Sequence, residues 1–296
     1  MAEHAGHQGP EKGELPVEYE QEYVDRGAER LGLQTYPEPD TPGVPAVVVW
    51  PAMGVPARFY RPFAIELRNV GLAVHVADLR GTGTSSPRPS RASRYGYADL
   101  AADVGAVQAV LKPRLEGRPL LLLGHSLGAH ACLLHLASTS GAGIAGMVMA
   151  AAGLAYWRPY PRARGVLTLM QTQSVGATAA LFGVWPGWGF GGRQSRGVIR
   201  DWSYTARHGR YPALNGFDPE PALAQLRTPV LAVSVEGDRY APAPGLDYLC
   251  RKLTAAPVKR MHYTTVEAGV RLSHFRWVRA GGPLARRVAE FAYAIH

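Results

Sequence analysis

The sequence predicts an α/β fold in which helices cover both faces of a mostly parallel sheet. Short apolar runs alternate along the chain with longer stretches whose apolar residues recur at helical spacing. This alternation is typical of parallel sheets, because parallel strands need helical crossovers. The chain is also long enough, at 296 residues with 47% hydrophobic residues, to bury one large core.

The first half of the chain is expected to supply most of the sheet. Two short antiparallel strands open it, and apolar runs rich in valine, leucine and methionine then alternate with helical patterns. The expected elements are strands 17–23 and 29–36, strand 45–50, helix 59–70, strand 73–77, helix 97–111, strand 120–123, helix 127–137 and strand 147–151. After residue 218 we expect strand 229–235, helix 244–253, strand 260–266 and helix 283–294.

The alternation stops between about residues 154 and 218, where the chain is rich in Trp, Gly, Pro and Arg. An inserted segment between two strands of a regular sheet indicates a lid subdomain. The chain therefore divides into residues 1–153, the N-terminal part of the core; residues 154–218, the predicted lid; and residues 219–296, the C-terminal part of the core.

Composition excludes several classes of function. The formal net charge is +9, but the basic residues are scattered and only four of the 32 are lysines, as a GC-rich genome produces irrespective of function. We therefore expect no nucleic-acid binding.

Residues 1–12 show no signal peptide, and no apolar run is long enough to span a membrane, so a cytoplasmic protein is expected. Two cysteines, Cys132 and Cys250, make no disulfide framework, and Cys132 is expected as a buried thiol.

Gly124-His125-Ser126-Leu127-Gly128 follows an apolar strand and opens a helix. This G-x-S-x-G context is typical of a nucleophile elbow, in which the serine lies in a strained turn with its hydroxyl above the sheet edge. Unpaired N–H groups at the helix start stabilise an oxyanion there. The pattern thus predicts acyl chemistry on Ser126.

A base and an acid follow in the chain order Ser, Asp, His. Asp238 comes directly after the strand at 229–235, and His274 lies between the last strand and the final helix. We expect His274 to act as the general base and Asp238 to orient it, with Glu236 as the alternative acid. His75, His125, His130, His135 and His262 fall inside strands, the elbow or its helix and are expected to be packing residues.

The oxyanion hole needs two N–H donors, one from the residue after the nucleophile and one from an earlier loop. Leu127 supplies the first, and Met53 in the turn Pro51-Ala52-Met53-Gly54 is the candidate for the second; a simple Pro/Gly turn is the alternative reading. No His, Cys and carboxylate spacing indicates a metal site. Gly81-x-Gly83 lacks a third glycine and a helix start, so no dinucleotide site and no cofactor are expected.

In these motifs the chain resembles the α/β-hydrolase superfamily from about residue 44 to 294. Four motifs carry the resemblance, in family order: Asp78-Leu79-Arg80-Gly81-x-Gly83-x-Ser85, the elbow, Gly237-Asp238-x-x-Ala241-Pro242, and Ser273-His274-Phe275. The turn at residues 51–56 and the following Arg58-Phe59-Tyr60 resemble a poorly characterised group of predicted bacterial hydrolases, although most relatives carry His-Gly in place of Pro51-Ala52. The resemblance implies an eight-stranded sheet with a lid after the sixth strand.

Substrate preference is expected in the lid. Trp157, Trp185, Trp188 and Trp202 are candidate substrate-binding residues for an aromatic or polyketide-like acyl group, and arginines of the lid are candidates for binding a carboxylate or phosphate; they are Arg158, Arg162, Arg164, Arg193, Arg196 and Arg200. The alternative is that the tryptophans form the lid's own core.

The sequence predicts a serine hydrolase that cleaves a small-molecule ester or thioester, free or carrier-bound, through an acyl-Ser126 intermediate. An acyltransferase or cyclase that uses the same intermediate is the main alternative. Lyase, haloperoxidase-like or cofactor-free oxygenase chemistry and a catalytically silent binding protein are further alternatives on the same fold. The oligomeric state is not predicted.

Overall fold

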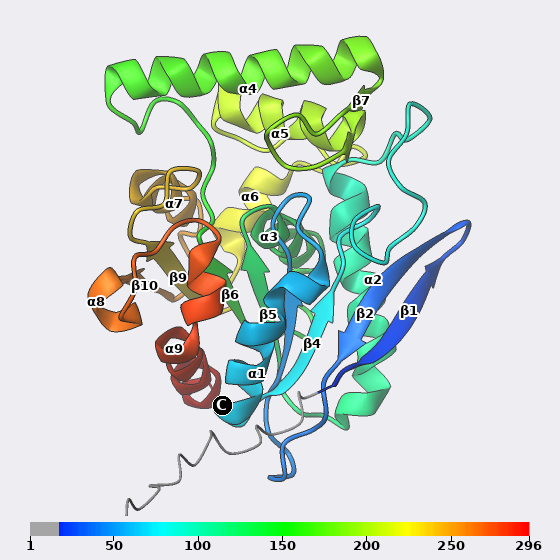
Figure 1. The fold of residues 1–296 in the computed structure, drawn as a ribbon, viewed down its shortest axis with the longest axis vertical. Helices are drawn as coiled ribbons and strands as arrows, with labels where there is room; N and C mark the ends of the chain where they lie inside the picture. Colours follow the sequence, from blue (N-terminus) through cyan, green and yellow to red (C-terminus); the bar gives the residue numbers. More distant parts are fainter. Residues whose placement is uncertain (1–17, 296) are drawn as a thin grey trace, which may run out of the picture.

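An eight-stranded sheet forms the centre of the molecule in the computed structural model, which describes residues 18–295 (Figure 1). The strand order is β1-β2-β4-β3-β5-β6-β9-β10, and every neighbouring pair from β4 to β10 is parallel. The β1–β2 and β2–β4 pairs are antiparallel. The strands are β1 (Glu20–Arg26), β2 (Glu29–Thr35), β3 (Ala46–Trp50), β4 (Ala73–Ala77), β5 (Leu120–His125), β6 (Gly146–Ala150), β9 (Val230–Val235) and β10 (Val258–Tyr263).

The central strands are buried on both faces, which explains their uninterrupted apolar sequences. Every residue of β3, β5 and β9 is buried. Side chains alternate between the two faces: Val48 and Trp50 belong to one hydrophobic core cluster, and Val47 and Val49 belong to the other. The sheet is therefore the shared wall between two cores.

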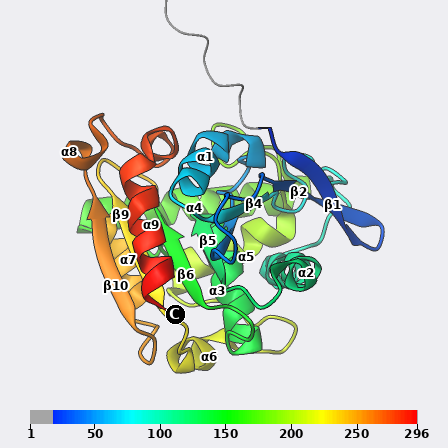
Figure 2. The same cartoon turned by 90° about the horizontal axis from the view of Figure 1, so that it is seen from below.

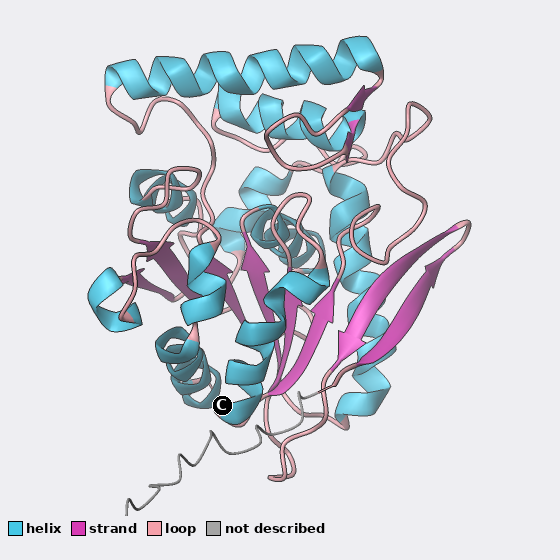
Figure 3. Cartoon of the chain, viewed as in Figure 1, coloured by secondary structure: helices cyan, strands magenta, loops and turns pink. Residues whose placement is uncertain are grey.

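Helices cover both faces of this sheet (Figures 2 and 3). One core contains apolar residues of α1 and α9, and the other contains those of α2, α3, α6 and α7. These helices are α1 (Arg61–Asn69), α2 (Tyr97–Leu115), α3 (Leu127–Thr139), α6 (Pro219–Gln225), α7 (Ala243–Cys250) and α9 (Gly282–Ala294). Three short helices, η1 (Ala57–Tyr60), α8 (Thr265–Ala268) and η2 (Arg276–Ala280), lie in connections.

The structure confirms the predicted α/β class and the eight-stranded sheet, and several elements differ from their expected bounds. The expected helix 59–70 is split into η1 and α1, and Pro62 lies in the first turn of α1. The expected helix 97–111 continues to Leu115, which is buried together with Leu111. The expected helix 244–253 ends at Cys250. Of the first expected strand, 17–23, Val17 lies outside the described residues, and β1 continues to Arg26.

The expected strand 260–266 ends early, at Tyr263. Thr264 caps the helix α8 that follows: its hydroxyl accepts a hydrogen bond from the Glu267 N–H, and the Glu267 carboxylate accepts one from the Thr264 N–H. This capping box turns the chain into a helix. Val266 is consequently 90% exposed instead of paired in the sheet.

Between β6 and α6 the chain forms elements that the sequence analysis did not assign: α4 (Arg162–Phe182), β7 (Val184–Trp185), β8 (Gln194–Ser195) and α5 (Arg196–His208). Figure 1 shows α4 lying across the top of the molecule, on the side toward which β4 and β5 point, and α4 packs on α5. These elements lie inside residues 154–218, whose boundaries and role as a lid stay predictions. No helix within residues 18–295 is long and apolar enough to span a membrane.

Candidate active site

Ser126 lies at the turn between β5 and α3. Its backbone has φ 52° and ψ −117°, a conformation that residues other than glycine rarely adopt. Its N–H donates a hydrogen bond to the Ala150 carbonyl oxygen at 3.2 Å, so the turn is attached to the neighbouring strand β6. The side chain is half-buried and lines a cavity of about 700 Å³. A strained serine at a cavity is the geometry of a nucleophile elbow.

The two glycines of the elbow leave no room for a side chain. A Cβ on Gly124 would lie 2.2 Å from the Ala129 Cα atom, and a Cβ on Gly128 would lie 2.2 Å from the Trp50 carbonyl oxygen. The Gly124 contact packs the start of α3 against β5, and the Gly128 contact packs it against the end of β3. The spacing of the motif therefore follows from backbone packing on both sides of Ser126.

Asp238 and His274 form a buried pair, with Asp238 Oδ2 2.8 Å from His274 Nδ1. Asp238 is 6% exposed and His274 is 4% exposed. The other carboxylate oxygen, Oδ1, accepts hydrogen bonds from the N–H groups of Tyr240 and Ala241 at 2.8 and 2.9 Å. Because Nδ1 donates to the carboxylate, Nε2 of a neutral His274 is the free acceptor, and His274 lines the same cavity as Ser126.

Glu236, the alternative acid, lies elsewhere. Its side chain is exposed, and its Oε2 accepts a hydrogen bond from the Thr265 N–H at 2.7 Å. The structure therefore brings Asp238, and not Glu236, to His274.

Met53 and Leu127, the predicted oxyanion donors, both line the cavity. Leu127 is the first residue of α3, and N–H groups in the first turn of a helix have no acceptor inside that helix. Met53 lies in the loop after β3, residues 51–56, which we call the oxyanion loop after the predicted role of Met53. The N–H of the preceding residue, Ala52, donates to the Tyr60 hydroxyl at 2.8 Å, which holds this loop in place.

Tyr60 joins the oxyanion loop to the elbow. Its hydroxyl accepts a hydrogen bond from the Ala52 N–H and forms a second hydrogen bond with His125 Nδ1 at 2.7 Å. Burial raises the pKa of Tyr60 and lowers the pKa of His125, so both groups are neutral. Sequence reasoning treated His125 as packing and gave Tyr60 no role, because the two residues are 65 positions apart.

The cavity has one aromatic side. Trp188, Phe190 and Trp202 line it, as do Tyr160 and Tyr240. The other two tryptophans of the predicted set do not line the cavity. Trp185 is buried and donates its Nε1–H to the Phe190 carbonyl oxygen at 2.8 Å, and Trp157 packs against the core.

Helix α4 presents a largely polar face to the cavity. The lining residues of this helix recur at helical spacing; they are Arg164, Thr168, Gln171, Thr172, Ser174 and Val175. Arg164 is the only one of the six lid arginines among the described lining residues. A glycine-rich loop, residues 187–192, completes this wall. A Cβ on Gly54 would lie 2.1 Å from the Gly191 carbonyl oxygen, so the loop is in backbone contact with the oxyanion loop.

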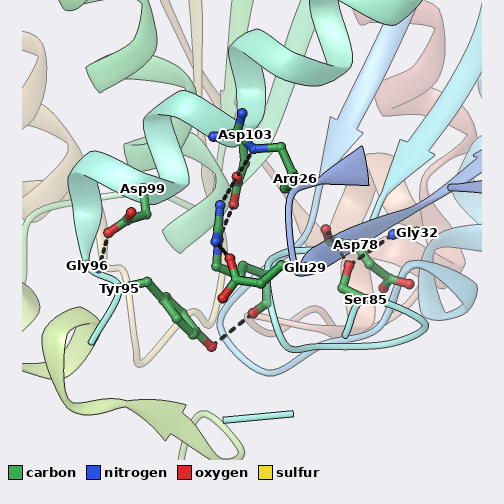
Figure 4. Close-up of polar contacts among 10 residues, drawn as sticks. Arg26, Glu29, Gly32, Asp78, Ser85, Tyr95, Gly96, Asp99 and Asp103 are labelled. Carbon is green, nitrogen blue, oxygen red and sulfur yellow. Dashed lines mark hydrogen bonds and ion pairs between the residues drawn. The ribbon is translucent and has the colours of Figure 1, made fainter. Parts of the chain in front are cut away.

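The motif at residues 78–85 holds loops together outside the cavity (Figure 4). Asp78 accepts hydrogen bonds from the N–H groups of Ala57 at 2.6 Å and Thr84 at 2.7 Å. Burial raises its pKa, although these hydrogen bonds oppose the shift. Arg80 pairs with Asp103 and Glu29. The motif is thus structural and fixes Ala57, at the start of η1, beside the oxyanion loop. Within residues 18–295, no group of three or more His, Cys, Asp or Glu side chains is arranged to hold a metal ion.

Solved structures with the same fold include enzymes that act on esters. Monoglyceride lipase from Saccharomyces cerevisiae superposes with a TM-score of 0.68 at 16% identity over 97% of this chain and 98% of that chain. Est1E from Butyrivibrio proteoclasticus, bound to ferulic acid, gives 0.63 at 14% identity over 92% and 99%. The thioesterase domain from the curacin biosynthetic pathway gives 0.58 at 18% identity over 93% and 99%. At these identities the likeness shows a shared fold. No curated protein matches the sequence.

A sequence model of one protein family matches this chain. The model Hydrolase_4, described as serine aminopeptidase, S33, matches residues 43–212, which is more than half of the chain. The matched region contains Met53, Ser126 and Leu127, whereas Asp238 and His274 follow it. The chain therefore belongs to the Hydrolase_4 family, serine aminopeptidase S33, and is an enzyme of the α/β-hydrolase fold.

Proposed function

We propose that the chain is a serine hydrolase that cleaves an ester or thioester through an acyl-Ser126 intermediate. One observation carries this proposal: the strained Ser126 and the buried Asp238–His274 pair open into one cavity. The proposal assigns Ser126 as the nucleophile, His274 as the base with Asp238 as its orienting carboxylate, and the N–H groups of Met53 and Leu127 as the oxyanion donors at this cavity.

In the proposed first half-reaction, Ser126 Oγ attacks the substrate carbonyl carbon while His274 Nε2 accepts the hydroxyl proton. The N–H groups of Met53 and Leu127 stabilise the negative charge on the carbonyl oxygen. The bond to the leaving group then breaks, and His274 returns the proton to the departing oxygen or sulfur. Water then attacks the carbonyl carbon of the acyl-enzyme while His274 accepts its proton. The bond to Ser126 Oγ breaks, His274 returns the proton to this oxygen, and the acid is released.

Asp238 supports this cycle electrostatically. Its hydrogen bond to Nδ1 fixes the tautomer of His274 and stabilises the imidazolium that forms at each transition state. Because Oδ1 is already bound by the two N–H groups of Tyr240 and Ala241, the carboxylate has one orientation. Substrate specificity is proposed to lie in the wall formed by α4 and the loop 187–192, acting as the lid.

The test is intact-mass analysis after exposure to a small, uncharged fluorophosphonate, with the parent protein and Ser126→Ala in parallel. We expect one adduct on the parent and none on the variant, together with a loss of esterase activity on the order of 10³ to 10⁶ in the variant. Activity within a few fold of the parent would contradict the nucleophile assignment. Adding an alcohol as a competing acceptor and analysing the products separates hydrolysis from acyl transfer.

A further inference from the structure

The charged residues that line the cavity all have the same sign. Arg164 and Arg239 line it, and the described lining residues include no aspartate or glutamate. Arg164 lies in the first turn of α4, and Arg239 directly follows Asp238 in the loop after β9. Two segments far apart in the sequence thus bring two arginines to one rim of the cavity.

The two arginines are held next to each other without a counterion. Arg164 Nη2 donates to the Arg239 carbonyl oxygen at 3.1 Å, and the Arg164 guanidinium lies 5.6 Å from the centre of the Tyr160 ring. Within residues 18–295, neither arginine forms an ion pair with a carboxylate. Two like charges that share a rim and lack an anion favour a ligand that supplies one.

The polar residues continue from this rim along α4. Thr168, Gln171 and Thr172 follow Arg164 on the same helix face and line the cavity. The Thr168 and Thr172 hydroxyls donate to the carbonyl oxygens of Arg164 and Leu169 within the helix. The side-chain amide of Gln171 is therefore the group among the three that offers donors to a carboxylate or phosphate oxygen. Trp188 and Trp202 also line the cavity, so its lining combines a polar, positively charged part with an aromatic part.

We propose that Arg164 and Arg239 form a subsite for an anionic group of the substrate, so that this enzyme prefers esters or thioesters that carry a carboxylate or phosphate. The inference rests on the proposed hydrolase function and specifies its substrate class. The anionic group belongs either to the acyl half or to the leaving group, and both sources present the same chemistry to the two arginines.

Two matched substrate pairs distinguish the sources. Monomethyl adipate carries a carboxylate where methyl hexanoate has a methyl group, so this pair places the charge on the acyl half. The hexanoyl thioesters of pantetheine phosphate and of pantetheine place it on the leaving group. We expect kcat/KM for the anionic member of at least one pair to exceed that of its neutral partner by about tenfold or more, as one charge-assisted hydrogen bond provides. Added salt should reduce this ratio, because the rim is exposed to solvent.

Substitutions assign the preference to residues. Arg164→Gln and Arg239→Gln should each lower the anionic-to-neutral ratio, and the double variant should bring it near one. Arg162→Gln is the matched control, because Arg162 lies in the same turn of α4 but does not line the cavity, and it should keep the parent ratio. A parent protein without preference in either pair, or a double variant with the parent ratio, would overturn the proposal.

Failure of this inference is distinguishable from failure of the proposed function. The uncharged fluorophosphonate reports on Ser126 without using the rim, and Ser126→Ala is assayed with the neutral members of both pairs. If Ser126 is labelled but the enzyme shows no preference for anionic substrates, the subsite proposal is refuted and the hydrolase proposal stands. If Ser126→Ala keeps full activity on neutral esters, both proposals are refuted.

Discussion

Replacing Tyr60 with Phe tests the hydrogen-bonded connection between the oxyanion loop and the elbow. The substitution removes one oxygen atom from a side chain with 0% exposure and leaves the ring in place. The Ala52 N–H loses its acceptor, and His125 Nδ1 loses its hydrogen-bond partner. Water has no access to either group, so the cost of an unsatisfied buried donor, about 1 to 3 kcal/mol, should appear in the free energy of unfolding.

The same substitution should slow the reaction, because the Met53 N–H follows directly on Ala52. Removal of one oxyanion donor costs about 10²- to 10³-fold in kcat in other serine hydrolases. Tyr60→Phe keeps the Met53 amide but releases the loop that aims it, so we expect a loss of about tenfold in kcat with little change in KM. The assay is steady-state kinetics on a neutral ester, with the rate of fluorophosphonate labelling as a second readout.

A matched Tyr→Phe control separates positioning from general destabilisation. Tyr263 is also buried, and its hydroxyl donates to the Ala280 carbonyl oxygen on the C-terminal side of the domain. Tyr263→Phe should lower stability by a similar amount and leave kcat unchanged. If Tyr60→Phe lost stability but kept kcat within twofold of the parent, Tyr60 would be a packing residue and the reasoning would be refuted.

Four further results are expected. Asp238→Asn should lower kcat by about 10³- to 10⁴-fold at unchanged circular dichroism, because the amide favours the wrong tautomer of His274; near-parent kcat would exclude Asp238 as the orienting acid. Asp103→Ala leaves the buried Arg80 with Glu29 as its remaining carboxylate partner and should cost about 1.5 to 3 kcal/mol in urea unfolding, whereas a cost below about 1 kcal/mol would show that the Arg80–Asp103 pair is dispensable. Burial lowers the pKa of His75 to about 4, so as pH falls from 6.5 to 4 this residue takes up a proton in the unfolded chain before it does in the folded chain, and it should contribute up to about 1.4 kcal/mol per pH unit to the loss of stability in this window. Burial also lowers the pKa values of His125, His130 and His135, so His75→Leu should reduce the slope in unfolding curves at pH 7, 6 and 5 by the His75 contribution without removing it, and an equal slope would contradict the assignment. Gly128→Ala should abolish fluorophosphonate labelling, because its Cβ would meet the Trp50 carbonyl oxygen at 2.2 Å; a normally labelled, stable variant would show that the elbow tolerates a side chain.

The sheet was predictable because its strands carry a local signal. Residues of β3, β5 and β9 are buried on both faces, so their sequences are continuous apolar runs that need no knowledge of neighbours. The elbow was predictable for a related reason. A Cβ on Gly124 or on Gly128 would lie 2.2 Å from a backbone atom, so only glycine fits at these two positions. Such a steric requirement shows in the sequence as a fixed residue type at a fixed spacing.

Helix α4 was not predictable in the same way, because it has no apolar stripe directed at a core. Leu167, Met170 and Leu181 on this helix are exposed, and the residues that line the cavity are mainly polar. A helix that covers a cavity does not show the usual amphipathic period. The tryptophans of the same segment show what composition leaves open: it locates them in the segment but does not tell lining residues, such as Trp188, from buried ones, such as Trp185.

The departure at Pro51-Ala52 can now be judged physically. The resemblance implied His-Gly at this place, and the replacement raised doubt about the geometry of the oxyanion loop. In the structure the loop is held by contacts that need neither side chain: the Ala52 N–H binds Tyr60, and the Pro51 carbonyl oxygen lies against Gly128, where a Cβ would approach it to 2.6 Å. A donor position set by backbone contacts tolerates a change of side chains on the loop, provided that the partners Tyr60 and Gly128 remain. The conformation of the loop is therefore fixed by its neighbours Tyr60 and Gly128. For this reason Tyr60→Phe is a sharper test of the predicted oxyanion hole than any substitution at residues 51 and 52.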